Sequence, residues 1–438
     1  MHRSPSEDLQ DRPYSERVTE VGGAPFRVTT RVIADVAAAD AAAEQEAGEP
    51  SAVWAGGDDR MVGYGMAARL EFTGPDRIPA AAAAWRALVR GREETVEARV
   101  PGAGLVAFGT FAFADDSAAT SVLLVPRRIV GRRSGTAYVT DVAGGPGHGP
   151  PTRLRAAEPA LSDDGYRLAV AEAVRRIRAG ELEKVVLART LLLQPPAGSD
   201  PVRTLRALHH RYGEAWTFAV DGFFGASPET LIASDGTTAR ARVLAGTAER
   251  RADPAEDEAT RDRLLASTKN RFEHALAVDS LLLTLGPHVQ EVTLGRPFAL
   301  GLPNVWHLAT DAEGVLTEDA GVLDLVAALH PTAAVAGAPR ETALRLIAEL
   351  EPFDRGRYAG PVGWLDATGA GEWAIGLRCA ELLDDGRVQA FAGAGVVAES
   401  DAGEELEETR WKFAPVLDAL GLSAAAAPPA ATAPQPVR

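Results

Sequence analysis

The chain has 438 residues, of which 46% are hydrophobic and 24% are charged, the composition of a globular protein with a sizeable core. Its 61 acidic residues outnumber its 45 basic ones, for a formal net charge of −16. This balance argues against a nucleic-acid-binding protein, which needs a basic surface. With one cysteine, Cys379, no intrachain disulfide can form, which suits a reducing cytoplasm. The charged N-terminus is not a signal peptide, and no run approaches the roughly 20 apolar residues of a membrane span. We expect no nucleic-acid partner and no membrane contact.

The two ends of the chain differ in composition from the rest. Residues 1–25 are polar and are expected to form a flexible extension, and the Ala/Pro-rich tail 423–438 is expected to be disordered. Residues 26–422 are then predicted to form a single large domain. The Gly/Pro-rich stretch 144–153 is the best candidate for a break between domains, although we favour a long loop inside one domain.

Hydrophobic periodicity predicts strands and helices in mixed order along the chain. Strands are expected at 105–116, 120–130, 184–193, 371–383 and 387–397. Helices are expected at 163–180, 261–286, 323–330, 340–351 and 404–420. This order predicts an α+β fold rather than simple βαβ winding.

The last predicted helix opens with the acidic sequence EELEET, residues 404–409. On a helix, Glu405 and Glu408 share a face with Lys412, whereas Glu404 and Glu407 are offset from them. A solvated face with a Glu–Lys pair is the ordinary explanation of such a pattern. However, apolar residues later in the helix show that it packs on something, and a glycine-rich strand that a ligand could approach closely precedes it.

Glu273 is a further candidate for a metal ligand and lies on the long predicted helix beside His274. Glu273 could form a structural ion pair. Alternatively, carboxylates from the two helices could form an oxygen-rich site, which suits Mg²⁺ rather than zinc. His274 is expected to be a packed or hydrogen-bonded histidine rather than a ligand.

Lys184 and Glu229 are candidates for proton transfer. Lys184 begins a strongly apolar strand, and Glu229 lies in a turn between apolar runs. A desolvated lysine has a lowered pKa and can act as a base, whereas a carboxyl in apolar surroundings has a raised pKa and can act as an acid. The ordinary alternatives are a strand-edge lysine that reaches solvent and a simple turn glutamate.

Two more polar residues lie in apolar strands. His307 is by default a hydrogen-bonded core histidine. Arg378 needs an anionic partner if it is buried, either a protein carboxylate or a substrate carboxylate. The glycine-interrupted sequences LAGT (residues 244–247) and FAGAG (391–395) are, taken alone, weak indications of a bound anion.

The order of these motifs is more specific than any one of them. EKVVLAR, GASPE, LAGT, FEH, WHLAT, LHPTAAVAGAP, ELEPFDRGRYAGPVGW, GEWAIGLRCA, FAGAGVV and EELEET follow one another along the second half of the chain. This series resembles the chorismate-utilising enzymes, and within them the isochorismate synthases, over roughly residues 50–420. The resemblance implies one large domain of packed antiparallel β-sheets surrounded by helices, with chorismate as substrate and Mg²⁺ as cofactor. The single cysteine makes a cytoplasmic location our expectation, and a monomer is our default.

The resemblance also implies a role for each matching residue. Lys184 would deprotonate water, and Glu229 would protonate the leaving hydroxyl. Glu273 and Glu408 would hold Mg²⁺ with Glu405 close by, while Glu404 and Glu407 would be surface charges. The substrate would be bound by Arg378, Lys412, His307 and the backbone near Gly246, Thr247, Gly393 and Gly395.

Two positions distinguish members of this family. Anthranilate synthases carry glutamine where Lys184 stands, and aminodeoxychorismate synthases carry a lysine at the position of Ala245. Lys184 and Ala245 therefore favour water as the nucleophile, and we expect no glutaminase subunit. A salicylate synthase, which would eliminate pyruvate from isochorismate, and a non-catalytic chorismate-binding relative are the alternatives. Leu406 replaces the family's usual aromatic residue, which affects helix packing but not the carboxylate spacing.

Overall fold

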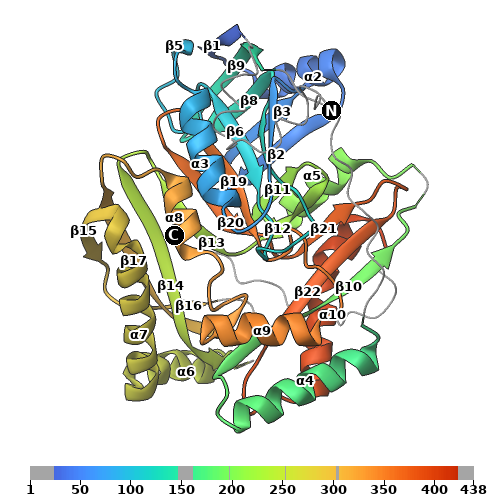
Figure 1. Ribbon diagram of the computed structural model, residues 1–438, viewed down its shortest axis with the longest axis vertical. Helices are drawn as coiled ribbons and strands as arrows, with labels where there is room; N and C mark the ends of the chain where they lie inside the picture. The colour runs from blue at the N-terminus through green and yellow to red at the C-terminus, as the bar shows by residue number, and fades with distance from the viewer. Residues whose placement is uncertain (1–23, 147–160, 197, 252, 302–304, 423–438) are drawn as a thin grey trace, which may run out of the picture.

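The computed structural model describes residues 24–146, 161–196, 198–251, 253–301 and 305–422. The predicted tail 423–438, the predicted extension up to residue 23 and most of the Gly/Pro-rich stretch 144–153 lie outside these ranges. Within them, two large sheets pack against each other and helices surround them (Figure 1). The predicted α+β fold is confirmed.

Sheet A has twelve strands among the described residues, in the order β18–β10–β22–β21–β12–β11–β2–β3–β8–β9–β1–β5. Neighbouring strands are antiparallel, except that β1 and β5 are parallel. The strands are β18 (Gly337–Ala338), β10 (Lys184–Leu193), β22 (Val388–Val396), β21 (Cys379–Leu382), β12 (Phe223–Ser227), β11 (Trp216–Val220), β2 (Pro50–Gly56), β3 (Asp59–Tyr64), β8 (Arg128–Arg133), β9 (Thr136–Gly145), β1 (Ala24–Val32) and β5 (Glu93–Val96).

Sheet B has the order β15–β17–β14–β13–β20–β19–β6–β7–β4 in the described part of the chain, with β16 also paired to β17. Its strands are β15 (Val289–Leu294), β17 (Val305–Leu316), β14 (Thr238–Glu249), β13 (Thr230–Ser234), β20 (Gly371–Ile375), β19 (Pro361–Asp366), β6 (Val106–Thr110), β7 (Ser121–Val125), β4 (Ala68–Phe72) and β16 (Phe298–Gly301).

The helices pack around both sheets. Figure 1 shows α4, α9 and α10 around β10 and β22, and α6 and α7 beside β14 and β17. No helix in the described ranges is long and apolar enough to cross a membrane. The helices are α2 (Val36–Ala47), α3 (Arg77–Leu88), α4 (Asp163–Arg178), α5 (Pro201–Arg211), α6 (Pro254–Ala266), α7 (Thr268–Leu285), α8 (Val322–Leu329), α9 (Arg340–Leu350) and α10 (Ala402–Ala419), with a 3₁₀ turn at Gly286–His288.

The main core lies between the two sheets. Trp54 from sheet A and Trp364 from sheet B are fully buried there. Both indole N–H groups donate to Glu372 Oε2, at 3.0 and 3.2 Å, and Arg133 forms an ion pair with the same carboxylate. Buried indole N–H groups need such an acceptor. The Glu372 carboxylate therefore links tryptophans on the inner faces of both sheets.

Three predicted elements are divided in the structure. The helix predicted at 261–286 is two helices, because Ser267 leaves helical geometry and its side chain caps α7 by accepting from Asn270 N. The strand predicted at 120–130 passes from β7 in sheet B to β8 in sheet A, with Pro126 between them. The strand predicted at 371–383 likewise leaves sheet B after β20 and enters sheet A at β21.

Candidate active site

Glu229 and Arg378 both lie where the chain crosses between the sheets. Glu229 stands between β12 of sheet A and β13 of sheet B, and Arg378 stands between β20 and β21. The two crossings are hydrogen-bonded to each other: Ile375 N donates to Glu229 O at 3.0 Å, and Ala226 N donates to Arg378 O at 3.2 Å. Both side chains are therefore attached to well-fixed backbone.

Arg378 has an unusual backbone conformation for a residue other than glycine, with φ of +47°. This left-handed geometry is uncommon for such residues and occurs at functional sites. Burial lowers the pKa of its guanidinium, and the carboxylate of Glu408 is among the groups that oppose this shift. No hydrogen bond or ion pair joins its guanidinium to another described residue, so it can receive an anionic ligand.

Lys184 is the first residue of β10 and pairs with Ala338 of β18. Its side chain passes over Gly395 of β22: a Cβ on Gly395 would lie 3.1 Å from Lys184 Cε and 3.7 Å from Nζ. The predicted partial burial of Lys184 is confirmed. The glycine at position 395 leaves the space that this aliphatic chain occupies.

The pKa values of Lys184 and Glu229 are shifted toward each other. Burial lowers the pKa of Lys184, and the nearby Glu229 carboxylate opposes that shift. Burial raises the pKa of Glu229, and Lys184, Arg378 and Lys412 oppose it. A base must be neutral and an acid must be protonated, so both shifts have the direction that proton transfer near neutral pH requires.

The acidic residues of α10 fall into two pairs. The helix begins after Asp401, whose side chain accepts from Gly403 N and Glu404 N. Glu404 and Glu407 are exposed, as expected, and Glu407 forms an ion pair with Arg410. Glu405 and Glu408 are half-buried.

Lys412 connects the acidic helix to β22. Its Nζ donates to Glu408 Oε1 at 2.5 Å and to Gly393 O at 2.8 Å. An ammonium has three donors, so one N–H remains for a ligand at this site.

Glu405 has the features of a cation ligand. Burial raises the pKa of its carboxyl, a hydrogen bond with Ser400 opposes that rise, and the charge of Glu408 adds to it. Its Oε2 atom is buried without a hydrogen-bond partner in the described residues. A buried carboxylate oxygen of this kind normally has a partner, and a hard divalent cation would supply one.

Glu273 precedes His274 on α7. Burial lowers the pKa of His274, and both ring nitrogens lie at hydrogen-bond distance from acceptors or donors, 3.1 Å from Ala245 O and 2.6 Å from Thr310 Oγ1. The prediction that His274 is a packed, hydrogen-bonded histidine is confirmed. The Glu273 side chain lies outside the described part of the structure. Among the described residues, no group of three side chains that could hold a metal is found. The complete ligand set remains a prediction.

His307 in β17 faces the lysine from sheet B. Burial lowers the pKa of its imidazole, a hydrogen bond with the backbone of Gly246 opposes this, and the charge of Lys184 lowers it further. Gly246 has φ of +80° at an irregularity in β14, and a Cβ there would lie 3.2 Å from Asn270 Cβ. Thr247 pairs in register with His307, but its side chain lies outside the described residues.

Tyr358 is a site residue that the sequence analysis missed. It is 3% exposed and stacks on Phe391 with 5.4 Å between ring centroids. Its hydroxyl lies 2.7 Å from the position that a Cβ on Gly393 would occupy. The available signal was a tyrosine within the glycine-rich motif RYAGPVG.

The structure thus brings most of the predicted residues together. Electrostatic interactions, hydrogen bonds and close approach connect Lys184 with β17, β22, α10 and the two crossings between the sheets, through the residues Glu229, His307, Arg378, Gly393, Gly395, Glu408 and Lys412. Gly246 joins them through His307.

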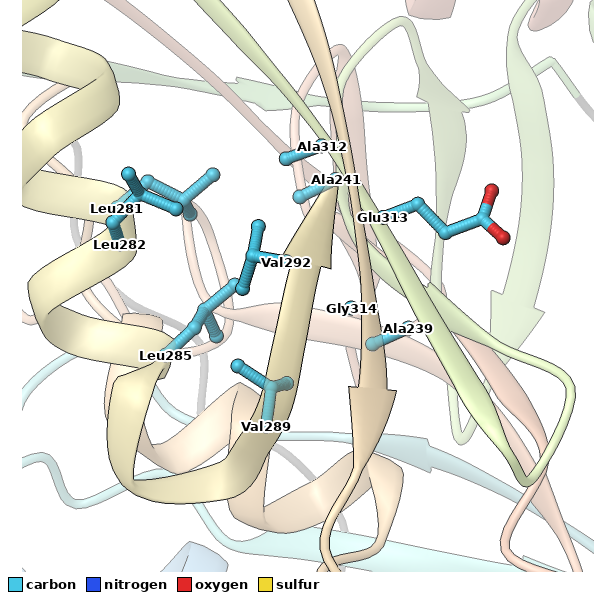
Figure 2. Close-up of a pocket in the computed structure, with 10 residues that line it drawn as sticks. All are labelled: Ala239, Ala241, Leu281, Leu282, Leu285, Val289, Val292, Ala312, Glu313 and Gly314. Atoms are coloured by element: carbon cyan, nitrogen blue, oxygen red, sulfur yellow. The ribbon is translucent and has the colours of Figure 1, made fainter. Parts of the chain in front are cut away.

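A separate cavity of about 10 Å³ lies between α7 and sheet B. Figure 2 shows aliphatic side chains such as Leu281, Leu285 and Val289 around it, while Glu313 points away. A space of this size and lining is a gap in packing rather than a binding site.

Gly395→Ala tests the placement of the lysine. The new methyl group is expected to push Lys184 aside while the strand remains paired. The contact requires a shift of a few tenths of an ångström, and a misplacement of about 1 Å can lower turnover by about 100-fold, so we expect kcat to fall by about 3- to 10-fold with the melting temperature kept. Gly286→Ala, where a Cβ meets nothing within 4 Å, is the control. Wild-type kcat in Gly395→Ala would contradict the observed path of Lys184.

A half-buried lysine near a half-buried glutamate, beside cationic side chains and an acidic helix, is an arrangement that suits proton transfer on an anionic molecule. The chain belongs to the chorismate-binding enzymes: the family model described as "Chorismate binding enzyme" matches residues 147–421. The resemblance seen in the sequence is confirmed.

Individual relatives agree with this family. The chain is 42% identical over 287 residues to a Mycobacterium tuberculosis protein designated MenF, covering 62% of this chain and 77% of that one. It is 37% identical over 281 residues to the isochorismate synthase DhbC of Bacillus subtilis, covering 60% and 70%. The solved structure of MenF, the menaquinone-specific isochorismate synthase of Escherichia coli, matches with a TM-score of 0.72 at 26% identity, covering 96% of this chain and 100% of that one.

Proposed function

We propose that the protein is an isochorismate synthase, which converts chorismate to isochorismate with Mg²⁺ as cofactor. The observation that carries this proposal is the proximity of Lys184 and Glu229, whose pKa values burial shifts in opposite directions. Alanine at position 245 leaves no lysine nucleophile in the LAGT motif, which favours water as the attacking group. The monomeric state and the cytoplasmic location remain predictions.

The proposed reaction is an addition of water with loss of a hydroxyl. Neutral Lys184 accepts a proton from water as the water oxygen bonds to C2 of chorismate. The ring double bonds shift, the C4–O bond breaks, and protonated Glu229 gives its proton to the departing hydroxyl. One water is consumed and one is released, so the net change is an isomerisation.

The remaining residues would bind and orient the substrate. Chorismate is a dianion, and Arg378 and the free N–H of Lys412 are cationic donors for its carboxylates. His307, kept neutral by burial, would lie beside the ring. The backbone at Gly393 and Gly395 allows close approach because no Cβ projects from it.

The carboxylates of α10 fit a metal ion. We propose that Glu408 and Glu405 from α10 and Glu273 from α7 hold Mg²⁺, consistent with the buried, unpartnered Oε2 of Glu405. When bound, the ion would neutralise the glutamates, accept the ring carboxylate and withdraw electrons from the ring.

The test is to incubate the purified protein with chorismate and Mg²⁺ and to separate the products by liquid chromatography. Isochorismate without pyruvate is expected. Salicylate with equimolar pyruvate, above a control without enzyme, would identify a salicylate synthase instead. Unchanged chorismate would overturn the proposal and favour a non-catalytic relative.

A further inference from the structure

A buried ion pair between Glu351 and Arg355 lies beside the strand that carries Lys184. Both side chains are 2% exposed. Arg355 Nε donates to Glu351 Oε2 at 2.7 Å, and Arg355 Nη2 donates to Glu351 Oε1 at 2.6 Å. Two parallel bonds of this kind fix the relative orientation of the two groups.

This ion pair also binds the edge of β10. Ala188 N donates to Glu351 Oε1 at 2.7 Å, and Arg355 Nη2 donates to Val186 O at 2.7 Å. The short strand β18 pairs only with Lys184 and Val185, so the next backbone groups on this edge lack a strand partner. The carboxylate acts as the missing C=O group and the guanidinium as the missing N–H group, so this edge of β10 is hydrogen-bonded as far as Ala188.

The same arginine fixes the segment that lies against Lys184. Arg355 Nη1 donates to Val335 O at 2.9 Å, and Val186 N donates to Ala336 O at 2.9 Å. The following residue, Gly337, lies so close to β10 that a Cβ on it would be 2.2 Å from Lys184 O. Arg355 therefore joins β10 to the segment that covers the start of the strand.

Apolar side chains could fill the volume of this ion pair at lower desolvation cost. They could not, however, accept from Ala188 N and donate to Val186 O. The backbone contacts, rather than burial alone, therefore explain why charged groups stand here.

We propose that Glu351 and Arg355 are positioning residues for Lys184: by completing the edge of β10, they hold the lysine above Gly395 and opposite Glu229. The proposal rests on the proposed function, in which Lys184 is the base. No contact in the described residues joins either of them to Arg378 or Lys412, although the Arg355 guanidinium lies 5.9 Å from the centroid of the Tyr358 ring, so their effect on kcat is expected to exceed their effect on KM.

The test uses substitutions that keep the charge and change the reach, Glu351→Asp and Arg355→Lys. Asp is too short to bridge Arg355 and Ala188 N, and Lys cannot provide the forked contacts. Glu349→Asp is the matched control, because Glu349 lies two residues before Glu351, in the last turn of α9, and pairs with Arg176 at the surface, 53% exposed. We expect kcat to fall by about 10- to 100-fold, as for a displaced catalytic group, with KM changed less than about twofold.

Hydrogen–deuterium exchange provides a readout that needs no substrate. Faster exchange is expected at the amides of 186–190 in both variants, with exchange in β11 and β12 unchanged and the control like the wild type. Wild-type exchange in β10, or a loss of kcat that merely follows a global loss of folded protein, would overturn the proposal. If Glu351→Asp does not fold, Arg355→Lys provides the same comparison. A wild-type protein that leaves chorismate unchanged would instead overturn the proposed function, while the exchange data would still test the edge contacts.

Discussion

Lys184→Ala is expected to lower kcat by about 100- to 10,000-fold, the usual contribution of a general base. The lysine lies over Gly395 and within the field of Glu229, and its removal leaves alanine, which cannot accept a proton. Product formation from chorismate at saturating substrate measures the effect. The adjacent exposed residue provides the control, because Glu183→Ala is expected to keep wild-type turnover. A melting temperature near that of the wild type would show that the fold is retained.

The pH dependence distinguishes the base from the acid. The pKa of Lys184 is lowered, so the neutral base appears at lower pH than for an ordinary lysine, and activity rises as this proton is lost. The pKa of Glu229 is raised, so the acid stays protonated to higher pH, and activity falls as its proton is lost. A bell-shaped kcat/KM profile is expected. The residual activity of Lys184→Ala should lack the rising limb and that of Glu229→Gln the falling limb; a retained limb would contradict the assignment.

Removal of the metal is expected to have a comparably large effect. Treatment with EDTA should stop turnover, and Mg²⁺ should restore it, because Glu405 and Glu408 would otherwise repel each other and the substrate carboxylates. Full activity in a metal-free sample would contradict the metal site.

A pair of substitutions on α10 locates the ion. Glu405→Gln is expected to weaken Mg²⁺ binding at least about 10-fold in calorimetric titration, since even residues behind the ligands contribute this much. Glu404→Gln changes an exposed carboxylate one residue earlier and should bind Mg²⁺ like the wild type. Equal affinities in the two variants would place the ion elsewhere.

Local sequence patterns correctly predicted the strand and the helix whose formation depends on neighbouring residues in the chain. The apolar run after Lys184 forms β10, and the acidic helix begins after the N-cap Asp401, with Glu405 and Glu408 on its half-buried face. The predicted separation of Glu404 and Glu407 from that face follows from the helical period.

The crossings between the sheets could not be predicted in the same way. An apolar stretch such as 371–383 has the pattern of one strand whether it stays in a sheet or passes to the next. The left-handed conformation of Arg378 depends on where two sheets meet, not on its neighbours in sequence. The positions of Tyr358 and of the Glu351–Arg355 pair beside the site likewise depend on strand order, which links residues far apart in the chain.

The N-terminal third of the chain builds the fold without contributing a candidate site residue. β2 joins sheet A through β11, and β6 joins sheet B through β19, whereas the family model begins only at residue 147. Backbone ladders and a packed core can be provided by many apolar sequences of similar volume. The strands β1 to β9 can therefore vary in sequence while both sheets keep their strand order.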